Sequence, residues 1–196
     1  MSAQHLPVLL EEVVEALRPA PGACLLDGTL GLGGHAGRWL EATEDCGEVG
    51  SVVGLDRDAH ALSRARERLD ERFPGRTTYV HASYEAAPEA VATARHGLVD
   101  AALLDLGASS LQLDTADRGF SFRLPGPLDM RMDSETGTAT AADLVNGADE
   151  RELTRIFADY GEEPAAARVA RAVIAERARA PFRDTLRLAE SVATAC

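Results

Sequence analysis

The sequence contains no lysine, so all 20 of its basic residues are arginines, and they face 32 acidic residues for a net charge of −12. An acidic chain repels phosphate groups, which disfavours non-specific binding of nucleic acid except where arginines gather. Cysteine is scarce as well. Cys24, Cys46 and Cys196 are odd in number and lack the spacing of metal ligands. They therefore indicate reduced thiols in a cytoplasmic protein.

Long hydrophobic runs are also missing. No segment approaches the ~20 apolar residues that a membrane-spanning helix needs, and the first five residues lack the basic and apolar regions of a secretory leader. The five histidines show no ligand spacing, so no metal is expected. The chain has 196 residues, and 45% of them are hydrophobic, which is enough for one domain with or without an insertion. Its oligomeric state stays open.

Apolar segments alternate with helical patterns in the first half of the chain. The sequence predicts strands at 23–27, 51–56, 77–81 and 99–106, and helices at 8–18, 34–43, from Asp58 to about Phe73, and 84–95. Such alternation is typical of an α/β fold with parallel strands and right-handed crossovers. Residues 107–137 show no period, and helices are predicted again from a capping pattern at Asp149 to about 160, at 165–179 and at 184–195.

The segment LLDGTLGLGGHAG, residues 25–37, is a strand that opens into a loop with five glycines. Glycine has no Cβ, so it permits positive φ and lets a ligand lie against the backbone. A strand, a glycine loop and a helix in this order usually form a nucleotide pocket.

Three aspartates, Asp27, Asp56 and Asp105, stand where predicted strands end, the edge at which open α/β sheets bind ligands. Each by itself is as often a helix or turn cap. Asp56 is placed to accept both hydroxyls of a ribose. The pattern Gly31-x-Gly33-x-x-Ala36 also fits an NAD-dependent oxidoreductase. Asp27 argues against NAD because it would repel a pyrophosphate, whereas the cationic sulfonium and ammonium of S-adenosylmethionine would be attracted.

Several motifs together resemble the bacterial ribosomal RNA small subunit methyltransferase H family. They are HLPVLLEE at 5–12, DGTLGLGGH at 27–35, LDRD at 55–58, LLDLGASSLQLD at 103–114, RGFSF at 118–122, GPLDMRMD at 126–133 and YGEE at 160–163. The resemblance implies a Rossmann-like, S-adenosylmethionine-dependent methyltransferase fold with strand order 3-2-1-4. It also implies methylation of the exocyclic N4 amine of a cytidine in the decoding region of 16S rRNA, with the small ribosomal subunit as partner.

The same resemblance assigns the site by position. It implies that cofactor contacts come from Gly33, Gly34, His35, Asp56, Tyr84, Asp105 and Gln112. Asp105 is the candidate catalytic group near the amine, with a backbone carbonyl in 105–109 as its rival. Structural alternatives stay open for three of these residues. His35 can be a residue that only starts a helix, and we favour this over a role in proton transfer. Tyr84 can be a core or surface aromatic, and Gln112 a loop residue. Leu111 stands where the family usually has proline.

Two sets of arginines are candidates for contact with RNA. Arg118, Arg123 and Arg131 in the long loop can hold a phosphate or the base, while an ion pair of Arg131 with Asp133 is the structural alternative. The second set either faces RNA or forms a solvated helix face, and consists of Arg168, Arg171, Arg177, Arg179, Arg183 and Arg187.

The resemblance implies a seven-stranded sheet, of which four strands are readable. We therefore expect residues 1–114 to be the N-terminal part of the methyltransferase domain, and 115–196 to be a loop plus a helical insertion that recognises RNA. An incomplete sheet would leave the 99–106 strand with an exposed apolar edge. Three interpretations follow: an rRNA cytidine methyltransferase or its N-terminal portion, an NAD-dependent oxidoreductase, and a truncated, non-catalytic remnant that binds cofactor or RNA.

Overall fold

The computed structural model describes residues 7–95, 98–135 and 137–196. The first two residues of the 5–12 motif, the N-terminal stretch 1–5 and His96 lie outside the described residues. The chain forms two compact units, residues 1–107 and 108–196, and each is described by itself. None of the helices in the described ranges is both long and apolar enough to span a bilayer.

Four parallel strands form the sheet of the first unit, in the order β3-β2-β1-β4. The strands are β1 (Cys24–Asp27), β2 (Ser51–Asp56), β3 (Thr77–His81) and β4 (Ala101–Leu103). The register pairs Asp27 with Gly54 on one side and with Leu103 on the other. This confirms the predicted α/β class, the strand order and the Rossmann-like arrangement.

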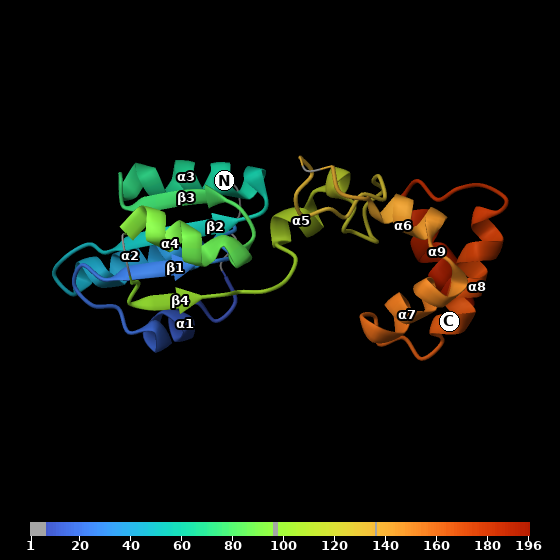
Figure 1. The fold of residues 1–196 in the computed structure, drawn as a ribbon, viewed down its shortest axis with the longest axis horizontal. Coiled ribbons are helices and arrows are strands. Elements are labelled where there is room, and N and C mark those ends of the chain that lie inside the picture. Colours follow the sequence, from blue (N-terminus) through green and yellow to red (C-terminus); the bar gives the residue numbers. More distant parts are fainter. Residues whose placement is uncertain (1–6, 96–97, 136) are drawn as a thin grey trace. The chain divides into compact units, whose positions relative to one another are not determined.

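Helices cover both faces of this sheet (Figure 1). On one face Leu25 and Val52 pack against α2 (Gly34–Asp45), which contributes the fully buried Trp39, and against α3 (Ala59–Arg72); α1 (Leu10–Leu17) contacts α2. On the other face Val53 and Leu55 pack against α4 (Ala87–Arg95), which follows the 3-10 turn η1 (Tyr84–Ala86). Because β2 is buried on both faces, its sequence is an apolar run rather than an alternating pattern.

The prediction of a strand over 99–106 is too long, since β4 has only three residues. Its neighbour β1 ends at Asp27, and the N–H of Gly28 donates to the carbonyl oxygen of Leu103 at 3.0 Å. Beyond that point β1 offers no backbone partner. Leu104 and Leu106 are instead 52% and 66% exposed, so the apolar sequence of 104–106 does not reflect burial.

The second unit is helical around its own core (Figure 1). Its helices are α5 (Ser110–Asp114), the 3-10 turn η2 (Ala116–Arg118), α6 (Ala141–Gly147), α7 (Glu150–Asp159), α8 (Ala166–Arg177) and α9 (Thr185–Ala195). Buried residues from the long loop and from these helices meet in the core, among them Leu128, Leu153, Val173 and Phe182. Leu128 therefore anchors the long loop to the helices.

Sequence reasoning missed α5, η2 and α6. Both α5 and α6 begin at capping boxes, Ser109 with Gln112 and Thr140 with Asp143, and these four-residue patterns were the signal that could have found them. The helices are short, so hydrophobic periodicity could not reveal them. The predicted caps Asp58 and Asp149 do accept N–H groups in the first turns of α3 and α7.

Two glycines lock the long loop at positions where no side chain fits. Gly119 has φ 73°, and a Cβ there would overlap the carbonyl oxygen of Pro127 and lie 2.7 Å from the nitrogen of Asp129. A Cβ at Gly126 would overlap the carbonyl oxygen of Ala116. The RGFSF and GPLDMRMD segments are therefore pressed together at backbone level.

We expect Gly119→Ala to destabilise the second unit by ~2 kcal/mol or more, through backbone strain and overlap. The measurement is thermal unfolding of the whole chain by circular dichroism. Gly147→Ala is the matched control, because a Cβ at Gly147 meets nothing within 4 Å and alanine favours its helix α6. An equal melting temperature for Gly119→Ala and the unmodified chain would contradict the proposed locking.

Candidate functional site

The glycine loop is tied to neighbouring strand ends by hydrogen bonds from its own backbone. Gly28 donates to the carbonyl oxygen of Leu103, Leu30 donates to that of Leu55 at 2.8 Å, and Gly31 donates to Oδ2 of Asp56 at 2.7 Å. These strand ends belong to β4 and β2, which flank β1. The loop is thus held by the sheet itself.

The loop glycines serve different purposes. A Cβ at Gly28 would meet Leu104, one at Gly33 or Gly37 would meet Leu69, and one at Gly34 would meet Pro7, so these glycines permit close packing within the protein. At Gly31, with φ 53°, a Cβ would meet only the carbonyl oxygen of Thr29 at 3.8 Å. Gly31 is therefore the loop position at which a ligand can approach bare backbone.

Asp27 lies beneath this loop and is 1% exposed. Burial raises the pKa of its carboxyl to about 7, opposed by the Thr29 N–H that donates to it at 3.1 Å and assisted by the negative charges of Asp56 and Asp105. Among the described residues, none of the largest influences on the pKa of this carboxyl comes from a basic side chain. The negative charges of Asp56 and Asp105 therefore act on Asp27, and together with burial they disfavour its ionised form.

The carboxylate of Asp56 holds the backbone of two neighbouring segments. Its Oδ2 accepts from Gly31, and its Oδ1 accepts from the N–H of Asp58 at 2.9 Å. Burial raises the pKa of Asp56, and these N–H groups oppose the rise. Each carboxylate oxygen has a second lone pair, so the predicted contact with a ribose is compatible with this structural role and stays a prediction.

Tyr84 and Asp105 lie next to the start of the loop. The Cβ of Tyr84 would be 3.1 Å from a Cβ at Gly28, and its side chain is 43% exposed. The N–H of Asp105 donates to Oγ1 of Thr29 at 2.7 Å, while Asp105 itself is exposed. Thr29 is the residue that sequence reasoning missed. Its signal was its place two residues after Asp27, where it closes a turn with that aspartate.

His35 lies in the first turn of α2 and is 7% exposed, and its Nε2 has no hydrogen-bond partner among the described residues. Gln112 belongs to the second unit, where its Oε1 accepts from the N–H of Ser109 at 3.0 Å in the capping box of α5. Gln112 is therefore a helix residue rather than the loop residue of our alternative. The proposed contacts of both side chains with the cofactor stay predictions.

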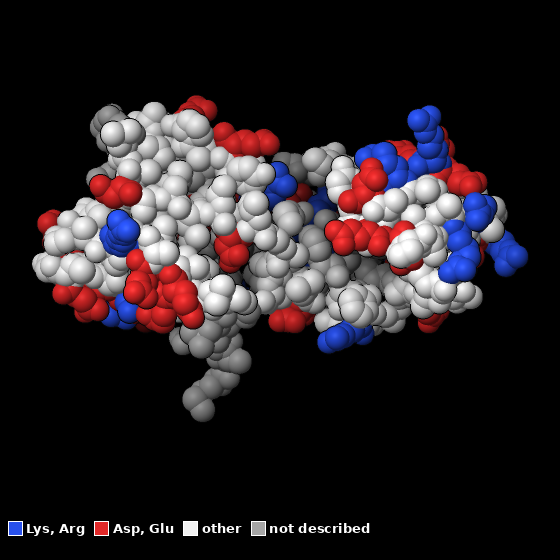
Figure 2. All heavy atoms as spheres, turned by 90° about the horizontal axis from the view of Figure 1, so that it is seen from below, with Lys and Arg blue, Asp and Glu red and all other residues white. Residues whose placement is uncertain are grey.

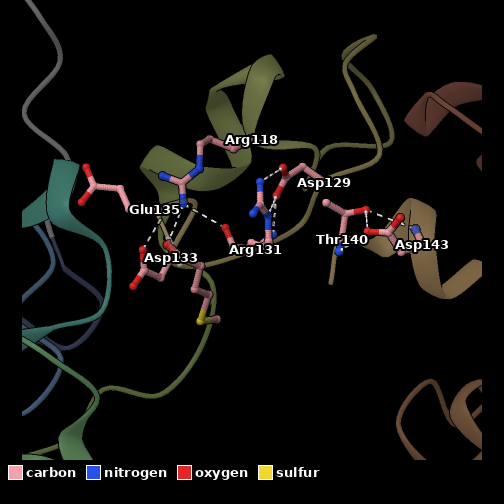
Figure 3. A network of polar contacts seen from close by, with 8 residues as sticks. Arg118, Asp129, Arg131, Asp133, Glu135, Thr140 and Asp143 are labelled. Carbon is pink, nitrogen blue, oxygen red and sulfur yellow. Dashed lines mark hydrogen bonds and ion pairs between the residues drawn. The ribbon is translucent and has the colours of Figure 1, made fainter. Parts of the chain in front are cut away.

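The arginines of the long loop are mostly engaged within it (Figure 3). Arg131 forms a two-pronged ion pair with Asp129, with distances of 2.9 Å and 2.7 Å, and this bond lowers the pKa of Asp129. Arg118 donates to the carbonyl oxygens of Arg131 and Met132 at 3.1 Å and 2.8 Å. An internal ion pair of Arg131 was the structural alternative, and the structure forms it with Asp129, a partner that the sequence did not suggest.

The C-terminal arginines are also partly used inside their own unit. Arg177 donates to the carbonyl oxygen of Val145, Arg187 to those of Pro181 and Ala180, and Arg168 to that of Cys196, while Arg171 pairs with Glu150 at 3.6 Å. Figure 2 shows arginines of this unit interspersed with acidic side chains on the face in view. Four of the six arginines thus make contacts that stabilise their own unit, whether or not they also face RNA.

Comparison with known proteins gives one consistent group. The profile of the MraW methylase family matches residues 2–196. A ribosomal RNA small subunit methyltransferase H from Magnetococcus marinus is 49% identical over 98% of this chain and 60% of its own length. One from Thermobifida fusca is 50% identical over 97% of this chain and 57% of its own length. The chain thus spans somewhat more than half the length of these relatives.

A precorrin-6y C5,15-methyltransferase from Geobacter metallireducens is similar in structure to 65% of this chain and 65% of its own, with 18% identity and a TM-score of 0.41. A likeness this distant carries no weight beside the strand order and the family match. Among the described residues, no cluster of three His, Cys, Asp or Glu side chains is placed to hold a metal ion.

We expect Asp27→Asn to change how stability depends on pH. Between about pH 4, where an unfolded aspartate titrates, and pH 7, the folded chain holds a proton at Asp27 that the unfolded chain has lost. The contribution of Asp27 to stability is therefore lost as pH rises through this window. The asparagine can still accept from Thr29, so the variant should be the more stable chain at pH 8 and gain least at pH 4.5.

Thermal unfolding at several pH values measures the difference between the two chains. Asp45→Asn, which changes an exposed aspartate of α2, should give a constant difference. Parallel curves for Asp27→Asn and the unmodified chain would show that Asp27 is not held protonated by burial.

Proposed function

The chain belongs to the MraW methylase family, and on that premise we propose that it contributes the S-adenosylmethionine site of an enzyme that methylates 16S rRNA. The proposed target is the N4 amine of a cytidine in the decoding region. The observation that carries the proposal is the buried carboxyl of Asp27 beneath a glycine loop, with Asp56 and Asp105 acting on it.

The residues around the loop fit a cationic ligand. A positive group near Asp27 would offset the burial and repulsion that raise its pKa, so binding would relieve an existing strain. A pyrophosphate would add to the repulsion instead. Gly31 offers backbone with an open side, Asp56 would hold the ribose, and Tyr84 would lie against the adenine. Gly33, Gly34 and His35 would shape the loop, and the family resemblance adds Gln112 as a further cofactor contact.

S-adenosylmethionine supplies a methyl group bound to a positively charged sulfur, which is reactive without a metal. The chain's own task is to align the cytidine amine and accept its proton, and alignment alone can be worth ~7–11 kcal/mol. The amine is conjugated with the ring, so it is weakly nucleophilic and needs an acceptor as it reacts. We assign this role to the exposed carboxylate of Asp105, whose backbone is fixed by Thr29.

Isothermal titration calorimetry tests the cofactor. We expect S-adenosylmethionine to bind and NAD to give no heat, because the aspartates would attract the sulfonium and ammonium of the former and repel the pyrophosphate of the latter. Asp56→Asn should weaken binding roughly tenfold, the loss expected for a hydrogen bond to a charged group. Asp45→Asn is the control. Preference for NAD would remove the methyltransferase assignment and favour the oxidoreductase alternative.

Transfer of a radiolabelled methyl group to small-subunit particles tests the reaction. We expect Asp105→Ala to abolish transfer while Asp45→Ala retains it. Mapping of the modified nucleotide distinguishes N4 of cytidine from other positions. Near-normal transfer by Asp105→Ala would assign the proton to another acceptor, such as a backbone carbonyl in 105–109. Cofactor binding without any transfer by the unmodified chain would favour the non-catalytic remnant.

A further inference from the structure

Phe122 is the most exposed large apolar residue among the described residues of the long loop, at 70%, and its neighbour Arg123 is exposed as well. The guanidinium carbon of Arg123 lies 5.6 Å from the centre of the Phe122 ring. Burying a phenylalanine is favourable by about 1.5–3 kcal/mol. A solvent-exposed phenylalanine therefore points to a binding surface when the backbone around it is ordered.

The backbone around these two residues is held by hydrogen bonds. Oγ of Ser121 accepts from the N–H groups of Arg123 and Leu124, both at 3.2 Å. Thr185 at the start of α9 donates its hydroxyl to the carbonyl oxygen of Leu124 and its N–H to that of Gly126, both at 3.0 Å. The loop is thus closed on the helical core, and Phe122 is displayed from a fixed position.

Arg123 also differs from its neighbours in the loop. Arg131 is neutralised by Asp129, and Arg118 is occupied by backbone carbonyls. In the described part of the chain, no salt bridge is found for Arg123. Its charge lies over the face of an exposed aromatic ring, which is an arrangement that suits a nucleotide: the ring stacks with a base and the guanidinium attracts the phosphate.

We propose that Phe122 and Arg123 form a stacking platform for an unpaired base of the RNA substrate. The inference rests on the proposed function and adds to it a contact made by residues other than the aspartates. Stacking on a ring tolerates any base, so the platform positions the RNA strand and does not read its sequence. Of the three loop arginines first considered for RNA, the structure leaves this role to Arg123.

The test uses the full chain and a short single-stranded oligocytidine. Trp39 is fully buried, so Phe122→Trp adds an exposed indole that a stacked base should quench on binding. Leu144→Trp, at a 39% exposed leucine of α6, is the matched control and should show no quenching. A duplex RNA of the same length should not quench either indole, because its bases are already stacked.

Affinity measurements separate stacking from simple apolar contact. Phe122→Leu should bind the oligonucleotide about tenfold more weakly, while Phe122→Tyr should bind as the unmodified chain does. Arg123→Gln should reduce the dependence of binding on salt by about one counterion. In methyl transfer to 16S rRNA, Phe122→Leu should raise KM for RNA and leave kcat and the affinity for S-adenosylmethionine unchanged.

Equal RNA binding by Phe122→Leu and the unmodified chain would overturn the platform, while methyl transfer by the unmodified chain would still uphold the proposed function. Conversely, quenching of Phe122→Trp in a chain that transfers no methyl group would uphold the contact and count against the enzyme. A loss of binding confined to assembled subunits, with free rRNA bound normally, would assign Phe122 to a ribosomal protein and overturn the proposal.

Discussion

The hydrogen bond from the N–H of Gly31 to the carboxylate of Asp56 fixes the glycine loop on which the candidate site depends. It joins the loop after β1 to the end of the neighbouring strand β2. Loss of this bond would release the position whose backbone is open to a ligand. The same carboxylate orders the turn into α3 through the N–H of Asp58, so a single side chain fixes both the glycine loop and this turn.

The buried carboxyl of Asp27 lowers the stability of the fold, and its place in the candidate site gives a reason for this. A carboxyl with raised pKa destabilises the fold at neutral pH relative to a neutral isostere, and its negative neighbours add to that cost. Residues at functional sites often lower the stability of a protein because its activity requires them. The attraction of a bound cation would offset the repulsion that Asp56 and Asp105 exert on Asp27, so this destabilisation is greatest in the absence of ligand.

Much of the first unit follows from its sequence because its strands are short apolar or β-branched runs between helical patterns, and β2 is buried on both faces. β2 and β3 match their predicted ranges, and the cap at Asp58 is local chemistry. The length of β4 could not be read, because it is set by where β1 stops rather than by the apolar residues Leu104 and Leu106 themselves. Asp27 and Asp56 do stand at strand ends, where topology places ligand sites, whereas Asp105 lies two residues beyond the end of β4.

The second unit was less predictable, since its loop is ordered by long-range backbone contacts. Nothing in the sequence around Arg118 says that its guanidinium will reach carbonyls more than ten residues away. Likewise, an arginine count cannot separate residues that hold the fold from those that remain available. With no lysine and an excess of acid, such a chain gains little from general attraction to RNA. The proposed contact with RNA would therefore depend on a few placed side chains, a requirement that an ordered, exposed aromatic beside an arginine meets better than a diffuse basic face.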